Sequence, residues 1–176
     1  NCYFRTARYN DALELAKAHV KDENLEDRVE WLVNLSKILY KNKDYEHAII
    51  AANDALSLGS SVEYSDPTPS LFDRFYSLLA LKRFTEAIST ISAIEQLRGQ
   101  DFKIIEAYAA ISDYAMKSND YAIATTYAKK ALELQTKAKI NTFSPKINFN
   151  YSEASLKTDN LGEALDEAKF ILNMKL

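Results

Sequence analysis

The chain has 176 residues, of which 47% are hydrophobic and 27% charged, a composition typical of a soluble globular protein. Its 22 lysines and arginines against 25 acidic residues give a net charge of −3, so no global basic field favours a nucleic-acid partner. Only three glycines and three prolines are present, which is too little turn chemistry for a barrel or sandwich of many short strands, so helices are favoured.

Apolar residues at helical spacing predict pairs of amphipathic helices along the chain. A partial repeat over residues 1–23 comes first, and the first complete pair is expected over 25–40 and 45–58, joined by a polar turn. Three more pairs are predicted over 68–81 with 84–98, 102–117 with 121–138, and 146–158 with 161–174. The repeats therefore cover about 25–58, 68–98, 102–138 and 146–174. No stretch alternates with period two for long enough to predict a sheet.

A short motif recurs at the start of the second helix of each pair, where a large apolar residue is followed three positions later by alanine. The pairs are Tyr9 and Ala12, Tyr45 and Ala48, Phe84 and Ala87, Tyr121 and Ala124, and Leu161 and Ala164, with Ala55 and Ala131 seven positions further on in two copies. The first alanines of successive copies are 36, 39, 37 and 40 residues apart. A near-constant period in this range indicates a solenoid of helical repeats.

The pattern resembles the tetratricopeptide repeat (TPR) superfamily. The resemblance is carried by Trp31, Leu32, Leu35, Asp44, Tyr45, Ala48, Ala55 and Leu56 in the first full repeat, and by Tyr108, Ile111, Ser112, Asp120, Tyr121, Ala124 and Ala131 in the third. It implies an all-α fold, a right-handed α-solenoid of antiparallel helix pairs with about four repeats plus a partial N-terminal one, over residues 1–176 as a single domain. Serines at 36, 112 and 152 stand where the family prefers glycine, and Phe75 does so in the second repeat.

Two local features modify this expectation. Asn148 and Ser155 fall at positions where apolar residues belong, so the first helix of the fourth repeat should pack less well than the others. Neither end of the chain, residues 1–6 or 170–176, has the polar face of a capping repeat. The chain is therefore expected to be a fragment of a longer repeat protein and to self-associate through uncapped solenoid ends.

In proteins that this chain resembles, the first helices of successive repeats line a concave groove that receives a partner's peptide or helix. The resemblance thus implies a partner-binding face made of Lys37, Tyr40, Lys41, Phe72, Tyr76, Leu79, Asp113, Met116, Lys117, Phe149, Glu153 and Leu156. For Tyr40, Phe72, Tyr76, Leu79, Met116 and Phe149, plain packing between helices is an equally good interpretation. Relatives that bind the acidic tails of heat-shock chaperones use a cationic clamp, and Asp113 and Glu153 occupy positions where cations would be needed, so this ligand is not expected.

No catalytic, metal or cofactor site is predicted. His19 and His47 are not placed together by the pattern, no glycine-rich phosphate loop or nucleotide fingerprint occurs, and Cys2 stands alone. No apolar run approaches the roughly 20 residues of a membrane helix, so direct membrane insertion is not expected. The sequence fits a soluble protein of the cytoplasm or periplasm and does not distinguish the two.

The leading hypothesis is a non-enzymatic scaffold for protein–protein interaction. It would bind a peptide or helix of a partner protein and help assemble a multi-subunit complex, for example a bacterial motility or secretion machine. The alternative is a ligand- or peptide-sensing regulatory module attached to an effector domain. An effector domain in the full-length gene would distinguish the second hypothesis from the first.

Overall fold

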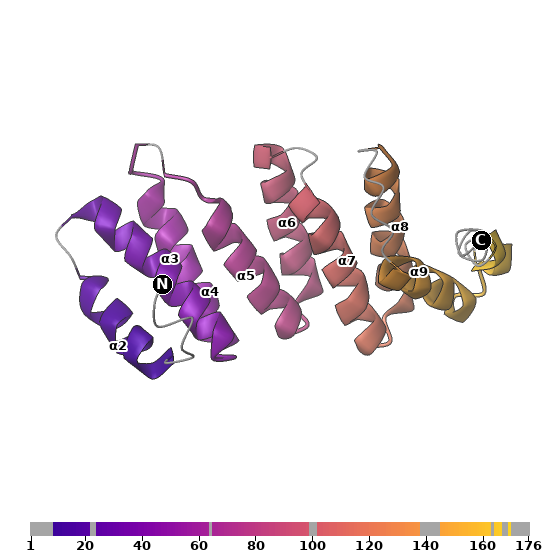
Figure 1. Cartoon of the computed structure of the whole chain (residues 1–176), viewed down its shortest axis with the longest axis horizontal. Coiled ribbons are helices and arrows are strands. Elements are labelled where there is room, and N and C mark those ends of the chain that lie inside the picture. The colour runs from indigo at the N-terminus through magenta and orange to yellow at the C-terminus, as the bar shows by residue number, and fades with distance from the viewer. Residues whose placement is uncertain are drawn as a thin grey trace. The chain divides into compact units, whose positions relative to one another are not determined.

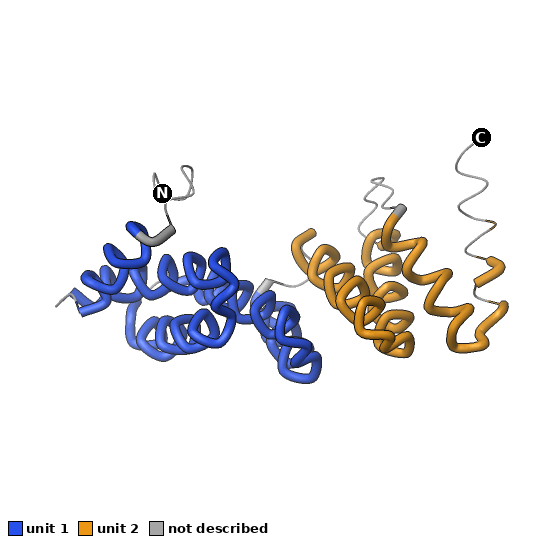
Figure 2. Tube along the Cα trace, turned by 90° about the horizontal axis from the view of Figure 1, so that it is seen from below, with its two compact units in different colours: residues 1–97 blue, residues 98–176 orange. Residues whose placement is uncertain are grey.

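The computed structural model describes residues 9–21, 24–63, 65–98, 102–137, 145–162, 164–166 and 169. Within these residues every regular element is a helix and none is a strand (Figure 1). The chain divides into two compact units, residues 1–97 (unit 1) and 98–176 (unit 2) (Figure 2). The predicted all-α class, with helices packed in antiparallel pairs, is confirmed, whereas a single domain over all repeats stays a prediction.

Unit 1 contains a succession of helices joined by short connections. They are α2 (Tyr9–His19), α3 (Leu25–Lys41), α4 (Tyr45–Gly59), α5 (Thr68–Ala80) and α6 (Phe84–Arg98), which reaches the boundary between the units. Helix α3 packs against both α2 and α4, α4 packs against α5, and α3 also contacts α5. The first helices of two successive repeats, α3 and α5, are therefore in direct contact.

Unit 2 repeats this arrangement. Its helices are α7 (Phe102–Lys117), α8 (Tyr121–Lys137) and α9 (Pro145–Lys157). Helix α8 packs against α7 and α9, and α7 contacts α9. Most of the predicted helix over 161–174 and the chain-end segments 1–6 and 170–176 lie outside the described residues. None of the described helices is long and apolar enough to cross a lipid bilayer.

The turn between the two helices of a pair has the same geometry in all four repeats. One residue of each turn adopts a left-handed backbone conformation, with φ between 58° and 64°, and these residues are Lys43, Lys82, Asn119 and Asp159. The next residue donates its N–H to a carbonyl five positions back, as Asp44 does to Leu39 at 2.9 Å. The turn residues are 39, 37 and 40 residues apart, like the last three intervals between the motif alanines. The structure therefore repeats with the period of the sequence motif.

Small residues occupy the core positions of the repeats. Ala48, Ala87 and Ala124 are fully buried, which lets helix axes approach closely. Of the residues at the glycine-like position of the first helix, Ser36, Phe75 and Ser112 are fully buried as well. In α9, Asn148 and Ser155 are buried, and poorer packing of this helix stays a prediction.

Candidate partner-binding face

An aromatic surface joins the first helices of two repeats in unit 1. The rings of Tyr40 in α3 and Tyr76 in α5 lie 6.3 Å apart, and Tyr76 lies 6.3 Å from Phe72. All three side chains are half-buried. The exposed Lys41 places its ammonium 5.7 Å from the centre of the Tyr40 ring. These residues, all predicted from the sequence, form one surface that presents aromatic rings next to a cation.

The same surface contains a carboxylate that the sequence prediction missed. The Ser36 hydroxyl of α3 donates a hydrogen bond of 2.8 Å to Oδ2 of Asp73 in α5. Burial raises the pKa of Asp73 above its ordinary value, and this outweighs the lowering effects of the Ser36 hydrogen bond and of the positive charges of Lys37 and Lys41. The sequence feature that could have predicted Asp73 is its position between Phe72 and Tyr76 on one helix.

Leu79 was predicted to lie on the partner-binding face, but it is buried in the structure. Its side chain is 0% exposed, as is that of the neighbouring Leu78. A fully buried leucine in α5 belongs to the core of unit 1 and offers nothing to a partner. The unit 1 face is therefore Lys37, Tyr40, Lys41, Phe72, Asp73 and Tyr76.

The corresponding face of unit 2 is centred on an acid that holds two lysines. Asp113 of α7 forms ion pairs of 2.8 Å with Lys117, one turn further along α7, and with Lys146 of α9. Burial acts to raise the pKa of Asp113, but the hydrogen bonds and positive charges of the two lysines together hold it below its ordinary value. Lys146 was not predicted, because nothing in local spacing links α9 to Asp113.

Large apolar side chains lie exposed on the same unit. Phe149 is 61% and Leu156 is 52% exposed on α9, seven residues apart and thus on one side of the helix. Glu153 between them and Met116 of α7 are half-buried. The unit 2 face is Asp113, Met116, Lys117, Lys146, Phe149, Glu153 and Leu156. It combines a cluster of paired charges with apolar side chains that are open to solvent.

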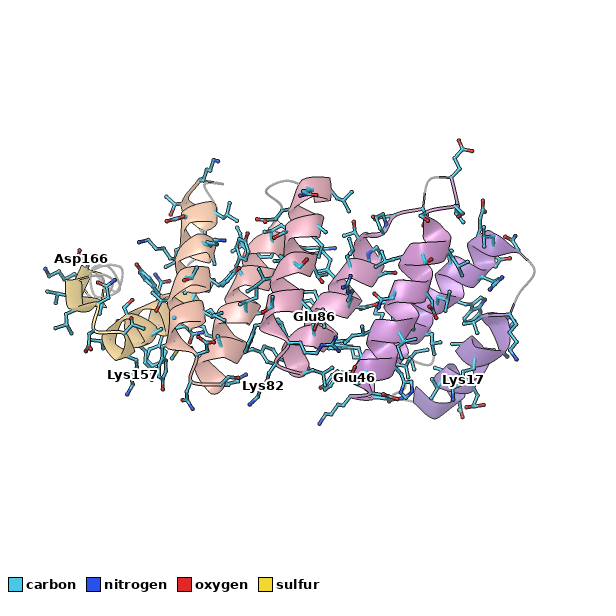
Figure 3. All side chains as sticks on the ribbon, turned by 180° about the vertical axis from the view of Figure 1, so that it is seen from behind. Lys17, Glu46, Lys82, Glu86, Lys157 and Asp166 are labelled. Atoms are coloured by element: carbon cyan, nitrogen blue, oxygen red, sulfur yellow. The ribbon has the colours of Figure 1, made fainter. Side chains whose placement is uncertain are left out.

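Charged residues on the second helices form a separate cluster. Arg83, at the start of α6, binds Glu86 through two hydrogen bonds of 2.6 and 2.7 Å and reaches Glu46 of α4 at 3.2 Å. Figure 3 shows Glu46 and Glu86 close together on unit 1. All these side chains are substantially exposed, so the cluster adds little to stability.

The two histidines have separate local contacts. His19 stacks on Trp31 with ring centroids 4.6 Å apart, and Nδ1 of His47 lies 2.8 and 3.0 Å from the Asp44 carboxylate oxygens. In the described part of the chain, no group of three or more His, Cys, Asp and Glu side chains could hold a metal ion.

The described helices form a repeating arrangement of pairs, and comparison of the sequence with protein-family models finds a helical repeat in part of the chain. Residues 3–63 match the tetratricopeptide repeat. No curated protein matches the sequence at a significant level. The resemblance inferred from the sequence is thus confirmed by a match to residues 3–63, which make up less than half of the chain.

Solved structures share this fold at low sequence identity. MamA, residues 41 to the end, from Desulfovibrio magneticus RS-1 has a TM-score of 0.73 at 16% identity, covering 98% of this chain and 89% of that one. The apo form of RapI has a TM-score of 0.72 at 19% identity, covering 94% and 48%. PlcR of Bacillus thuringiensis, in complex with the peptide PapR7 and DNA, has a TM-score of 0.57 at 13% identity, covering 98% and 66%. At these identities the likeness concerns the fold alone.

Proposed function

We propose that this chain is a non-enzymatic interaction module, which binds a peptide or helix of a partner protein and helps hold a multi-subunit complex together. The observation that carries the proposal is the contact between Tyr40 and Tyr76. It makes aromatic side chains from two successive first helices into one half-exposed surface. Aromatic residues bury a large area at a small entropic cost, which makes them frequent anchors of protein interfaces.

The chemistry of the unit 1 face defines the segment that would fit it. Tyr40, Phe72 and Tyr76 would pack against an apolar or aromatic side chain of the partner. Asp73 accepts a hydrogen bond from Ser36, while its two carboxylate oxygens can accept several. A backbone N–H or a basic side chain placed beside it would stabilise a carboxylate that burial destabilises. The proposed ligand is therefore an extended or helical segment with an apolar anchor next to a hydrogen-bond donor.

The unit 2 face would contribute a second contact of the same kind. Phe149 and Leu156 are open to solvent on one side of α9 and can bury apolar area against a partner. Lys117 and Lys146 are held by Asp113, and with Glu153 the two acids and two lysines of this face balance in formal charge. We expect the unit 2 face to contribute apolar contact area to the interface and not to select a partner by its charge.

The test is affinity capture with the full-length parent protein, identification of the captured partner by mass spectrometry, and measurement of its affinity. A Tyr40→Ala and Tyr76→Ala double variant should bind the purified partner about tenfold more weakly or worse, as for removal of interface anchors. Phe102→Ala, which removes an exposed aromatic residue of α7 outside both faces, is the matched control and should bind normally. Equal binding by the double variant, with its folding checked by thermal unfolding, would overturn the proposal.

A peptide-sensing regulatory module is the second candidate. It is favoured by the fold shared with PlcR, whose structure holds the peptide PapR7. Two observations would move it ahead: a small peptide that co-purifies with the full-length protein, and an effector domain in the same gene whose activity changes when that peptide is removed.

A further inference from the structure

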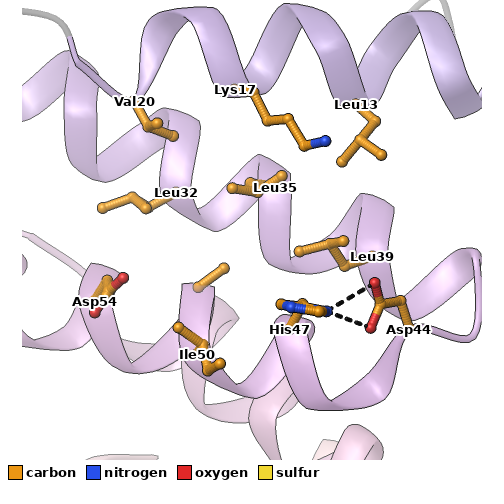
Figure 4. A pocket seen from close by; sticks show the side chains of 11 residues that line it. Leu13, Lys17, Val20, Leu32, Leu35, Leu39, Asp44, His47, Ile50 and Asp54 are labelled. Carbon is orange, nitrogen blue, oxygen red and sulfur yellow. Dashed lines mark hydrogen bonds and ion pairs between the residues drawn. The ribbon is translucent and has the colours of Figure 1, made fainter.

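A groove of about 340 Å³ lies on unit 1 between α2 and α4 (Figure 4). Its floor is formed by α3 through Leu32, Leu35 and Leu39. One wall comes from Leu13 and Lys17 of α2 with Val20 just after that helix. The other comes from His47, Ile50, Ala51 and Asp54 of α4, with Asp44 just before that helix. The groove uses the second helices of two repeats and is separate from the faces described above.

The three helices present their lining residues in parallel rows. In each row these residues are spaced three or four positions apart and span seven positions. The rows run from Leu13 in α2 to Val20 just after it, from Leu32 to Leu39 in α3, and from His47 to Asp54 in α4. Seven residues of helix extend over about 10 Å. A partner helix with apolar residues at i, i+3 or i+4, and i+7 presents a stripe of the same length.

The floor of the groove is part of the core, while its α4 wall is open. Leu35 packs against two buried clusters, one with Ala12, Ala16 and Ile38 and one with Leu39, Ala48 and Ala51. Ile50, in contrast, is 54% exposed although it lines the groove. The floor is therefore rigidly held, and the open wall retains apolar area that a ligand can bury.

Acidic side chains predominate among the charges that line the groove. Asp44 and Asp54 stand on the α4 side against Lys17 on the α2 side, and Lys17 already pairs with Glu14 at 3.4 Å. Asp44 pairs with His47. The side chain of Asp54 is exposed and makes no hydrogen bond or ion pair with any described part of the chain. The rim is thus complementary to a cationic ligand whose charge approaches the α4 wall.

We infer that this groove binds a basic amphipathic helix of a partner protein. The apolar stripe of that helix would lie on the leucine floor and against Ile50, and a lysine or arginine beside the stripe would pair with Asp54. The inference does not depend on the proposed function, because it uses the α2 and α4 side of unit 1 and not the surface formed by α3 and α5.

Two fluorescein-labelled helical peptides of roughly 18 residues test it against the full chain. Both carry leucine at the stripe positions, and they differ only in whether lysine or glutamate flanks the stripe. Fluorescence anisotropy should show the lysine peptide binding at least about tenfold more tightly than the glutamate peptide. The difference should shrink as salt is raised, because exposed charges are screened.

Matched variants locate the binding site. Asp54→Lys should weaken the lysine peptide and strengthen the glutamate peptide, while Glu133→Lys on α8 makes the same change of charge outside the groove and should alter neither. Ile50→Glu should abolish tight binding, while Leu15→Glu, at an exposed leucine of α2 that does not line the groove, should not. Melting temperatures of all four variants separate lost binding from lost folding.

Several results would overturn the inference. Equal affinity of the two peptides, or no saturable binding of either, would remove the basic helix as the occupant. Equal effects of Ile50→Glu and Leu15→Glu would place binding elsewhere. A concentration-dependent dimer of the chain that Ile50→Glu abolishes would identify a second copy as the occupant, and an aliphatic ligand that co-purifies and is lost with Ile50→Glu would identify a lipid-like molecule.

Discussion

The Ser36 hydroxyl of α3 donates a hydrogen bond of 2.8 Å to the carboxylate of Asp73 in α5, so one bond connects the first helices of two successive repeats. Ser36 is fully buried and Asp73 is half-buried, and this burial raises the pKa of Asp73. Ser112 of α7 occupies the corresponding position of another repeat and is equally buried, but its hydroxyl has no hydrogen-bond partner in the described structure. The same residue type therefore has opposite energetic roles at two equivalent positions.

Alanine at these two serines should have opposite effects on stability. Ser36→Ala removes a hydrogen bond to a poorly solvated carboxylate and should lower the free energy of unfolding by about 1.5–3 kcal/mol. Ser112→Ala removes a buried hydroxyl without a partner and should leave stability unchanged or raise it. Urea unfolding at pH 7 measures both. Equal losses in the two variants would show that the Ser36–Asp73 hydrogen bond adds nothing beyond the packing of a serine.

Asp73 should make stability fall as pH rises. Because its pKa is raised in the folded protein, the folded state holds this proton more tightly than the unfolded state. The stabilisation is complete below the unfolded pKa, near 3.8, and is lost as pH rises through the folded pKa. Asp73→Asn keeps an oxygen acceptor for Ser36 but cannot ionise. Its stability relative to the natural chain should therefore increase from pH 3 to pH 7.

A matched variant isolates this effect. Asp166→Asn replaces an exposed acid of unit 2 and serves as the control for removing one negative charge. Urea midpoints measured for the three proteins at several pH values provide the comparison. A difference between Asp73→Asn and the natural chain that is flat across this range would show that burial of Asp73 carries no energetic penalty.

Features that arise within one helix pair could be predicted from the sequence, and contacts between helices of different repeats could not. Each described end of the paired helices from 25 to 157 lies within one residue of its predicted position, because apolar spacing and polar turns are local signals. Ser36 and Asp73, in contrast, meet across two repeats. Such a contact depends on how one helix is rotated against another, which local spacing does not determine.

Leu79 illustrates the same limit within a single helix. It lies three residues after Tyr76 and therefore on nearly the same side of α5, yet Tyr76 is half-buried and Leu79 fully buried. The boundary between the buried and the partly exposed side of α5 therefore lies between Tyr76 and Leu79. The groove between α2 and α4 was missed for a related reason, since it depends on the separation of two helices that are distant in sequence.

The alanines of the repeated motif should not tolerate larger side chains. Ala48 and Ala124 are both 0% exposed. Leucine at either position has no space to occupy and should cost about 1–3 kcal/mol through displaced neighbours. Ala122→Leu, two residues before Ala124 and exposed on the same helix, is the control and should be close to neutral. Unchanged denaturant midpoints for Ala48→Leu and Ala124→Leu would show that these alanines do not lie at tight helix crossings.

The contribution of Asp113 to stability should depend on pH in the opposite sense to that of Asp73, because its pKa is lowered and not raised. Hydrogen bonds from Lys117 and Lys146 hold the pKa of Asp113 below its ordinary value in spite of burial, so its contribution to stability is present at neutral pH and is lost as pH falls through the folded pKa. Lys146→Met removes one of the two lysines and should raise the pKa of Asp113, while Lys157→Met, at an exposed lysine of the same helix, should not. Side-chain carboxyl chemical shifts followed by NMR report both aspartates in one titration. If Lys146→Met left the Asp113 titration unchanged, the ion pair between α7 and α9 would not form in solution. Lys146 would then be available to bind an acidic partner.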